Sequence, residues 1–311
     1  MHTGNSNRWF AIVNPVSGNG KSGRKWGEVQ QALLNAGIDF DFQLTTKPRE
    51  AESIVQTAIQ QGFRKIICVG GDGNMHDIAN GLLTQNYVSS SDVTLAIIPL
   101  GTGNDFVKHY KIPAKISEAI ELLKRENTVL HDAGKAISYE NGKAKARYFI
   151  NFCGVGFDAF VVERAAPLKP YGQIAYLLGT LRWMFPYKKP LLRITTAERV
   201  IETECYLALA GIGKYSGGGM MLTPGAIAND GKFFLTIAKN LSKIEVVLRL
   251  KMLYDGSIGT HPEVECFQTD SIRIEVLQEY FPVKMQADGD VLGVGPFDIS
   301  IIPRALKVVV P

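Results

Sequence analysis

Three glycine-rich turns in the first third of the chain carry residue types that bind phosphate groups. The turns span residues 14–23 (NPVSGNGKSG), 70–77 (GGDGNMHD) and 99–105 (PLGTGND). Glycine lets the backbone approach a ligand closely, and a helix that follows such a turn offers N–H groups to an anion. Asp72 lies inside the second turn, where a carboxylate beside phosphate groups normally indicates a divalent cation between them.

Other interpretations of these turns stay open. The first turn fails the P-loop pattern, which requires glycine where this chain has Pro15. Residues 18–23 match the GxGxxG pattern of dinucleotide-binding oxidoreductases, in which Asp39 or Asp41 could bind a ribose. Each turn could also connect a strand to a helix without binding a ligand, and Asp72 would then form an Asx turn. Three turns at the same edge of a parallel sheet favour a ligand site, because parallel strands gather the following loops at their carboxyl ends.

Short apolar runs precede the turns and predict buried strands that would position them. Strands are expected at residues 9–13, 38–45, 65–69 and 93–99. Helices are expected at residues 24–35, 51–61, 75–83 and 116–125. Alternation of strands and helices predicts an α/β domain with a mostly parallel sheet covered on both faces.

After residue 133 the pattern changes to strand-like runs. The Asn141-Gly142 pair lies between runs at 136–139 and 144–151, which indicates a hairpin. Further runs occur at 191–196, 200–210, 233–238, 264–268, 272–277, 283–286 and 306–310. The second half is therefore predicted to be an antiparallel β-sandwich.

Two helices are expected to interrupt these strands. One spans residues 172–185. The other begins at Ser242 and ends near residue 256, with Glu245 completing a capping box.

Composition narrows the function classes. The 311 residues are 46% hydrophobic and 21% charged, which is ordinary for a globular protein and excludes disorder, collagen and a membrane bundle. The net charge of +4 is too small for a nucleic-acid partner and favours anionic small molecules or an anionic membrane surface. The four cysteines form no CxxC pair and are expected to be reduced thiols. With no membrane-length apolar run and no secretory signal, a cytoplasmic location is expected.

In this order and spacing, the three turns resemble the catalytic domain of the diacylglycerol kinase family, and in particular the soluble bacterial lipid kinases. The resemblance continues at residues 151–158 (NFCGVGFD), 224–232 (PGAIANDGK) and 286–290 (QADGD). Sphingosine and ceramide kinases share the pattern, whereas NAD kinases share only the GGDG turn. The resemblance therefore covers nearly all of the chain.

The resemblance implies transfer of the γ-phosphoryl group of ATP, with Mg²⁺, to the hydroxyl of diacylglycerol or a related lipid. Residues 1–133 would form the nucleotide-binding α/β domain, onto which C-terminal residues could pack back, and residues 134–311 the β-rich acceptor domain. The implied nucleotide-binding residues are Asn14, Ser17, Gly18, Thr45, Gly70, Gly71, Asp72, Gly73, Asn74, His76, Gly101, Thr102, Asn104 and Asp105.

The second half would supply the metal site and the catalytic acid. The resemblance implies that Mg²⁺ is held by the Asp230 carboxylate and by the backbone carbonyls of Ile227 and Lys232. It implies that Asp290 is the catalytic base, with Asp288 beside it. A lipid hydroxyl is a poor nucleophile, so a carboxylate within hydrogen-bond reach must accept its proton. Taken alone, Asp-Gly-Asp would more often be a surface turn.

Several positions depart from the family pattern. The usual GGDGTxNE reads here with Asn74, His76 and Asp77, and the last acid of DGE is Asp290, one methylene shorter. A displacement of about 1 Å at a reacting centre can cost about 100-fold in rate, so these changes bear on the strength of catalysis. The alternatives are a kinase of a soluble acceptor such as NAD, and a weakly active regulator that binds nucleotide or lipid.

A basic, aromatic segment suggests where a lipid acceptor is met. Its residues are Lys169, Arg182, Trp183, Phe185, Tyr187, Lys188 and Lys189. Basic side chains with interfacial aromatics suit reversible contact with an anionic membrane surface. The alternative is a helix packed on the sandwich with a solvated basic end. Nucleic acid is not an expected partner, and the resemblance allows a homodimer.

Overall fold

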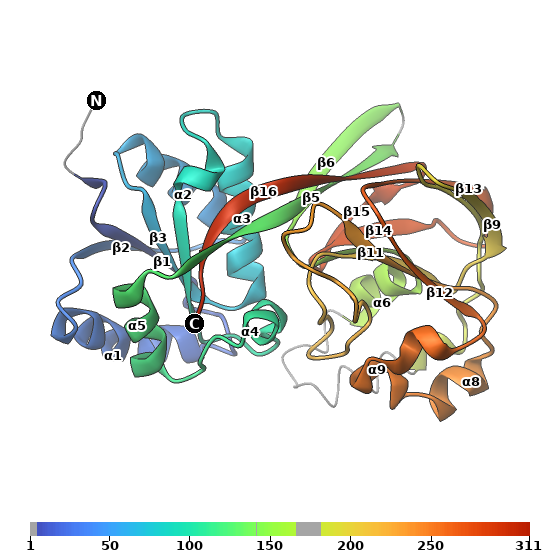
Figure 1. Ribbon diagram of the computed structural model, residues 1–311, viewed down its shortest axis with the longest axis horizontal. Coiled ribbons are helices and arrows are strands. Elements are labelled where there is room, and N and C mark those ends of the chain that lie inside the picture. The colour runs from blue at the N-terminus through green and yellow to red at the C-terminus, as the bar shows by residue number, and fades with distance from the viewer. Residues whose placement is uncertain (1–4, 141, 166–181) are drawn as a thin grey trace. The chain divides into compact units, whose positions relative to one another are not determined.

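The computed structural model describes residues 5–140, 142–165 and 182–311. It divides into two compact units: the first is Met1–Asp132 with Arg304–Pro311, and the second is Ala133–Pro303. The chain passes from one unit to the other within two long strands, β5 (Thr128–Glu140) and β16 (Phe297–Val309) (Figure 1).

The first unit has a parallel sheet. Its strands are β1 (Trp9–Val13), β2 (Phe40–Leu44), β3 (Lys65–Gly70) and β4 (Thr94–Pro99). They lie in the order β2-β1-β3-β4, and the end of β16 continues the sheet, with Lys307 and Val308 pairing in parallel with β4. The prediction of a parallel α/β domain is confirmed.

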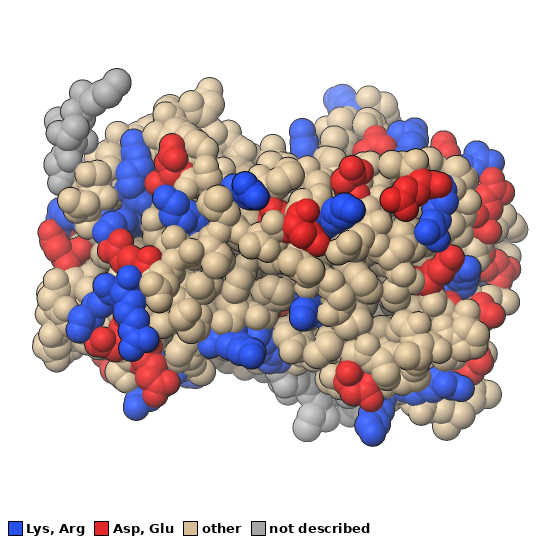
Figure 2. Space-filling view, viewed as in Figure 1, with Lys and Arg blue, Asp and Glu red and all other residues tan. Residues whose placement is uncertain are grey.

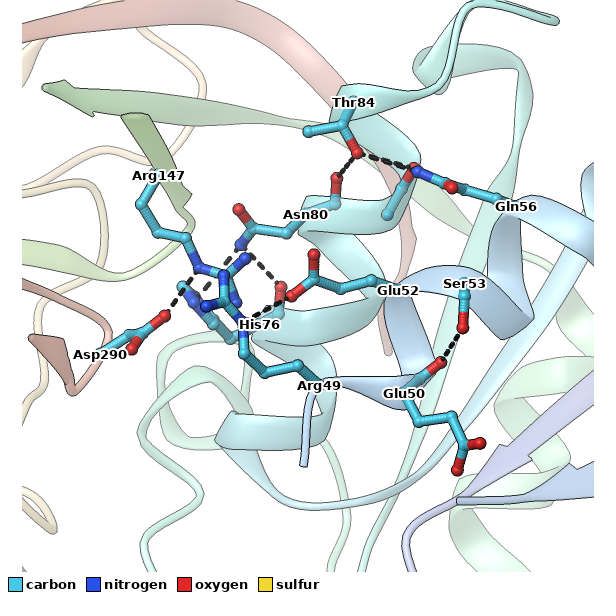
Figure 3. A network of polar contacts seen from close by, with 11 residues as sticks. Arg49, Glu50, Glu52, Ser53, Gln56, His76, Asn80, Thr84, Arg147 and Asp290 are labelled. Carbon is cyan, nitrogen blue, oxygen red and sulfur yellow. Dashed lines mark hydrogen bonds and ion pairs between the residues drawn. The ribbon is translucent and has the colours of Figure 1, made fainter. Parts of the chain in front are cut away.

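Helices alternate with these strands along the chain. They are α1 (Lys21–Asn35), α2 (Glu50–Gln60), α3 (Asp72–Thr84), the short 3-10 helix η2 (Ser90–Asp92), α4 (Asp105–Tyr110) and α5 (Ile116–Arg125). β1, β3 and β4 are almost wholly buried, which explains their continuous apolar sequences. Helices α2 and α3 are neighbours, and the Gln56 amide donates to the Thr84 hydroxyl at 3.0 Å (Figure 3).

Two helices differ from the expectation. α3 begins at Asp72, so half of the GGDG turn is helical: the Met75 N–H donates to the Gly71 carbonyl at 3.1 Å. α4 was not predicted, because a six-residue helix gives no periodic signal. Its start is stabilised by Asp72, which is distant in sequence.

The second unit is antiparallel, as predicted. Its strands besides the shared β5 and β16 are β6 (Lys143–Phe149), β7 (Phe152–Gly156), β8 (Leu191–Thr195), β9 (Val200–Glu204), β10 (Leu207–Gly211), β11 (Phe233–Ala238), β12 (Val264–Thr269), β13 (Ser271–Gln278), β14 (Lys284–Ala287) and β15 (Asp290–Val294). One layer has the order β12-β11-β10-β7-β14-β15, and the other pairs β16-β13-β8-β9. β5 and β6 form the predicted hairpin.

The second unit corrects several predicted elements. The run 200–210 is two strands, β9 and β10. It is interrupted where the Cys205 N–H donates to the Pro190 carbonyl and the Tyr206 N–H donates to the Ala238 carbonyl. β7, β15 and helix α6 (Phe157–Ala165) were not predicted.

The second predicted helix of this unit is present as two short ones. They are α8 (Lys243–Leu248) and α9 (Met252–Asp255), followed by the 3-10 helix η4 (Ser257–Thr260). The capping box is confirmed: Ser242 Oγ accepts the Glu245 N–H at 3.2 Å, and Glu245 Oε2 accepts the Ser242 N–H at 2.9 Å. Most of the helix expected at 172–185 lies outside the described residues.

Charge and thiols agree with the composition. On the face shown in Figure 2, basic and acidic side chains are interspersed. The four cysteines, all within the described residues, are free thiols. Within the described part of the chain, no helix has the length and apolarity needed to cross a membrane.

Candidate active site

The three glycine-rich turns of the first unit meet at one edge of its sheet. A Cβ atom on Gly101 would lie 2.4 Å from Gly71 Cα, so the second and third turns are in backbone contact. The Gly70 carbonyl accepts the N–H groups of Leu100 at 2.7 Å and Gly101 at 3.0 Å. The first turn joins them, since a Cβ on Gly18 would lie 2.2 Å from the Leu100 carbonyl oxygen. Glycine is therefore required at these contacts, where no side chain fits.

The first turn is held largely by its own hydrogen bonds. N–H groups at six of its positions bond within the turn, namely Val16, Ser17, Gly20, Lys21, Ser22 and Gly23. Asn14 supplies two of the acceptors, its side-chain oxygen and its carbonyl. The sequence predicted that N–H groups here face a ligand, but these six are used internally. The turn thus provides shape and close approach more than donors.

The second turn has a different character. Gly71 is the N-cap of α3 and, being glycine, makes no side-chain capping hydrogen bond. The first N–H groups of a helix lack partners inside it, and together with the helix dipole they favour an anion. Around Gly73, no described atom lies within 4 Å of a built Cβ, so space is open beside this part of the helix.

Asp72 connects the second turn to the third. Its carboxylate accepts the N–H groups of Asp105 at 2.9 Å and Phe106 at 3.2 Å, which are the first residues of α4. This is the capping geometry that the ligand-free interpretation of Asp72 anticipated, made to a distant helix instead of to its own turn. Its role beside a divalent cation stays a prediction.

Asn74 and His76 are directed into the protein. Asn74 is 2% exposed, and its amide donates to the carbonyls of Ile12 at 3.0 Å and Val69 at 3.2 Å. His76 is also buried, and the Asn80 amide donates to its carbonyl at 2.9 Å (Figure 3). Asn74 therefore connects α3 to β1 and β3 by hydrogen bonds. Both residues were expected to contact nucleotide, and that contact stays untested.

Other predicted contacts lie around the same turns. The Thr45 N–H donates to the Val13 carbonyl at 2.8 Å just after β2, and Thr102 is exposed. The Asn104 amide nitrogen donates to the Gly101 carbonyl at 3.0 Å. Its Oδ1 is buried and accepts no hydrogen bond from the described part of the chain. Such an orphaned acceptor marks a place where a bound group can supply a donor.

The acids proposed for the dinucleotide interpretation have another partner. Arg8 forms ion pairs with Asp39 at 2.8 Å and Asp41 at 3.0 Å. These carboxylates are therefore engaged with a guanidinium group, which weakens their case as ribose-binding acids.

In the second unit, the Asp288 carboxylate binds backbone N–H groups between β6 and β7. Its carboxylate accepts the N–H groups of Ile150 at 2.7 Å, and of Asn151 and Phe152 at 3.0 Å each. Asp288 has a φ of 48°, in the left-handed region, and its own N–H donates to the Phe152 carbonyl. The carboxylate thus fixes the connection between β6 and β7, which makes Asp288 a positioning residue.

Asp290 is placed differently. It begins β15, and its carboxylate pairs with the Nε of Arg147 at 2.8 Å (Figure 3). The Arg147 side chain is 6% exposed, whereas that of Asp290 is 36% exposed. A buried guanidinium therefore orients a carboxylate that stays accessible.

A partly buried chain of hydrogen bonds supports this hairpin, and the sequence motif alone did not reveal its function. The Gln286 amide donates to Asp158 Oδ2 at 2.5 Å and accepts the Gly289 N–H at 2.6 Å. Burial raises the pKa of Asp158 to about 6, and the Gln286 hydrogen bond opposes this by less. Gln286 thus connects a half-buried acid of α6 to the turn between Asp288 and Asp290.

The predicted magnesium residues lie on an exposed loop. Asp230 Oδ1 accepts the Lys232 N–H at 3.0 Å, and Oδ2 accepts the Gln268 amide at 2.8 Å. Among the residues described, no group of three or more His, Cys, Asp or Glu is placed to hold a metal. One carboxylate with the Ile227 and Lys232 carbonyls is a hard-oxygen set with room for water, which fits Mg²⁺.

The predicted membrane segment is only partly exposed. Lys169 lies outside the described residues. Tyr187 is buried, and its ring packs edge-on to that of Phe157 with 5.1 Å between the ring centroids. The prediction that Tyr187 lies at a membrane interface is therefore wrong. Lys189 pairs with Glu204 at 3.8 Å. Phe185, Lys188 and Arg182 are exposed.

Comparison with known proteins identifies both halves. Residues 8–136 match the model of the diacylglycerol kinase catalytic domain. Residues 151–310 match the model of the YegS C-terminal NAD kinase beta sandwich-like domain. The two matches together cover most of the chain.

Similar proteins match nearly the whole chain. A diacylglycerol kinase from Bacillus subtilis is 27% identical, over 96% of this chain and 95% of its own. The crystal structure of “a putative diacylglycerol kinase” from Bacillus anthracis is 26% identical with a TM-score of 0.76, over 98% of both chains. Yeast NADH kinase, solved with NADH, is 12% identical with a TM-score of 0.53, over 99% of this chain and 84% of its own, so the likeness is one of fold. The chain therefore belongs to the diacylglycerol kinase catalytic-domain family and is an enzyme of the lipid kinase class.

Proposed function

We propose that this enzyme transfers the γ-phosphoryl group of ATP, with Mg²⁺, to a hydroxyl of diacylglycerol or a related lipid. The observation that carries the proposal is the backbone contact of Gly71 with Gly101 at the start of α3, whose N-cap is a glycine. Phosphoryl transfer needs little covalent work from the protein; it needs positioning and neutralisation of charge. A glycine cradle formed by backbone beside a helix N-terminus supplies both for a triphosphate.

Nucleotide binding is assigned to the first unit. The open space beside Gly73 and the first turn of α3 would take phosphate oxygens, and the Gly18 turn would close around them. The orphaned Oδ1 of Asn104 fits a donor such as a ribose hydroxyl. Thr45 and Thr102 stay in the proposed contact set, whereas Asn74 acts by holding α3 in place.

Metal binding is assigned to the loop that contains Asp230. Its carboxylate and the Ile227 and Lys232 carbonyls would hold Mg²⁺, which when bound would supply positive charge that stabilises the loop. Asp230 is kept in place by Gln268 and by its own loop backbone.

Acceptor activation is assigned to Asp290. It is the partly exposed carboxylate of the Asp-Gly-Asp element, and it would accept the proton of the lipid hydroxyl. Arg147 orients it, and Asp288 fixes the backbone beside it. The shorter side chain of aspartate is here combined with a buried guanidinium that limits its motion.

The proposal is tested with γ-labelled ATP, Mg²⁺ and a total lipid extract. Label should enter the organic phase, and identifying the labelled lipid names the acceptor. Label that stays in the aqueous phase as a phosphorylated nucleotide would favour the soluble-acceptor alternative. Asp290→Asn should reduce transfer by about 100-fold or more while ATP binding persists. Equal turnover in this variant would show that another group is the base.

The acceptor also implies where the enzyme works. Diacylglycerol-like lipids reside in bilayers, so we propose peripheral association with a membrane surface during turnover. A homodimer is part of the same proposal only as an expectation from the family resemblance. Light scattering of the purified chain measures it directly.

A further inference from the structure

The outer face of α8 presents apolar side chains to solvent. Ile244 is 72% exposed and Leu248 is 77% exposed, and Val247 between them is also exposed. The spacing of three and four residues puts these side chains on one face of the helix. Val246, on the other side, packs against the buried core cluster of the unit. The helix is therefore held from inside and leaves an apolar stripe uncovered by the described residues.

A second apolar residue adjoins this stripe. Phe185 is 63% exposed, and the Lys243 ammonium donates to its carbonyl oxygen, which places Phe185 beside the start of α8. We define the α8 surface as Phe185, Ile244, Val247 and Leu248 together with the basic residues Lys188, Arg249 and Lys251.

Basic side chains border the apolar ones. Lys188, Arg249 and Lys251 are exposed, and the Lys188 ammonium lies 5.1 Å from the ring centre of exposed Tyr280. Lysine and arginine reach outward while their stems cover apolar surface. An apolar centre with a basic border complements hydrocarbon beneath anionic headgroups.

Two acids lie among the three bordering cations and offset part of their charge, because Glu245 interacts electrostatically with Arg249 and Asp255 with Lys251. The Glu245 carboxylate is bound to the Ser242 N–H in the capping box. The Asp255 carboxylate accepts the Ser257 hydroxyl at 2.6 Å and the Ser257 N–H at 3.0 Å. Both carboxylates are held by local hydrogen bonds, and the three exposed cations outnumber these two acids, so the border keeps a net positive charge.

We propose that the α8 surface docks on an anionic lipid bilayer. The inference rests on the proposed function, because an enzyme that phosphorylates a bilayer lipid must meet the bilayer. A stable protein dimer commonly buries about 800 Å² on each partner, which is more than one face of a six-residue helix and one phenylalanine supply. A small apolar contact strengthened by a few cations gives reversible membrane binding instead.

The test measures co-sedimentation of the full chain with vesicles of phosphatidylcholine, with and without phosphatidylglycerol. The double variant Ile244→Ser with Leu248→Ser should lose at least about tenfold in binding to the anionic vesicles. Arg249→Gln with Lys251→Gln should remove most of the preference for phosphatidylglycerol. Val200→Ser is the matched control, since Val200 is also exposed in the same unit, and it should bind as the unsubstituted chain does.

Two results would overturn the docking surface. One is unchanged vesicle binding by the Ile244 and Leu248 double variant. The other is a change of oligomeric state in light scattering with vesicle binding intact, which would make α8 a contact between copies of the chain. If the unsubstituted chain binds vesicles through α8 but phosphorylates no lipid, even one dispersed in detergent, the docking surface stands and the proposed function fails.

Discussion

Gly101→Ala is the sharpest test of the cradle. The new Cβ would lie 2.4 Å from Gly71 Cα and 2.8 Å from Asn104 Oδ1, whereas ordinary contact begins at 3.4 Å. The obstructing Gly71 atom belongs to backbone and has no rotamer to change, so the two turns must separate by about 1 Å, a shift that at a reacting centre can cost about 100-fold in rate. Overpacking of this kind also costs about 1–3 kcal/mol of unfolding free energy.

The assay combines turnover with stability. kcat/KM for ATP should fall by about 100-fold, ATP affinity should weaken, and urea titration should show the lower unfolding free energy. Gly27→Ala is the control: it lies within α1, no described atom lies within 4 Å of its built Cβ, and alanine there should stabilise the helix by about 1 kcal/mol. Wild-type turnover and stability in Gly101→Ala would refute the contact between the two turns.

Two further predictions concern acids of the second unit. Asp288→Asn should lower the unfolding free energy by about 1–3 kcal/mol, because one amide cannot accept three backbone N–H groups in the way that a carboxylate does; loss of activity with undiminished stability would instead indicate a direct catalytic role. Asp158 has a folded pKa of about 6 against an ordinary 3.8, so the fold favours its protonated form. Its contribution to stability should be complete below pH 3.8 and be lost as pH rises through 6, a change of about 3 kcal/mol that Asp158→Asn should remove from urea titrations repeated across this range.

The first unit could be predicted closely because its signals are local. Continuous apolar runs gave β1, β3 and β4, and the predicted helix 116–125 is α5 at the same residues. The start of α3 was missed because Gly71 and Gly73 suggest a turn, whereas the N–H of Met75 already bonds back to Gly71. Glycine adopts the conformations of both turns and helix ends, so its presence alone does not locate the start of a helix.

The second unit was harder because its short strands depend on distant partners. β7 reads as a glycine-rich segment, yet it lies at the centre of a sheet between β10 and β14. Its Gly154 leaves the space that the half-buried Asp158 carboxylate occupies, since a Cβ there would lie 2.0 Å from Asp158 Oδ2. No pattern within residues 151–158 predicts that the missing side chain at Gly154 makes room for the Asp158 carboxylate.

The sequence identified the motif residues by their residue types, but the structure was needed to show which groups each of them contacts. Asp72 and Asp288 were expected beside phosphate or acceptor, which stays a prediction, and the structure shows that each binds backbone N–H groups at the start of a helix or a strand. Asp290 and Asp230 keep exposed side chains. A carboxylate saturated by N–H donors is stabilised as a rigid clamp, and one left accessible can take a proton or a metal. Aspartate at 290 is thus the accessible acid of this element and the one we propose as the base, while Asp288 fixes the backbone from which that shorter side chain extends.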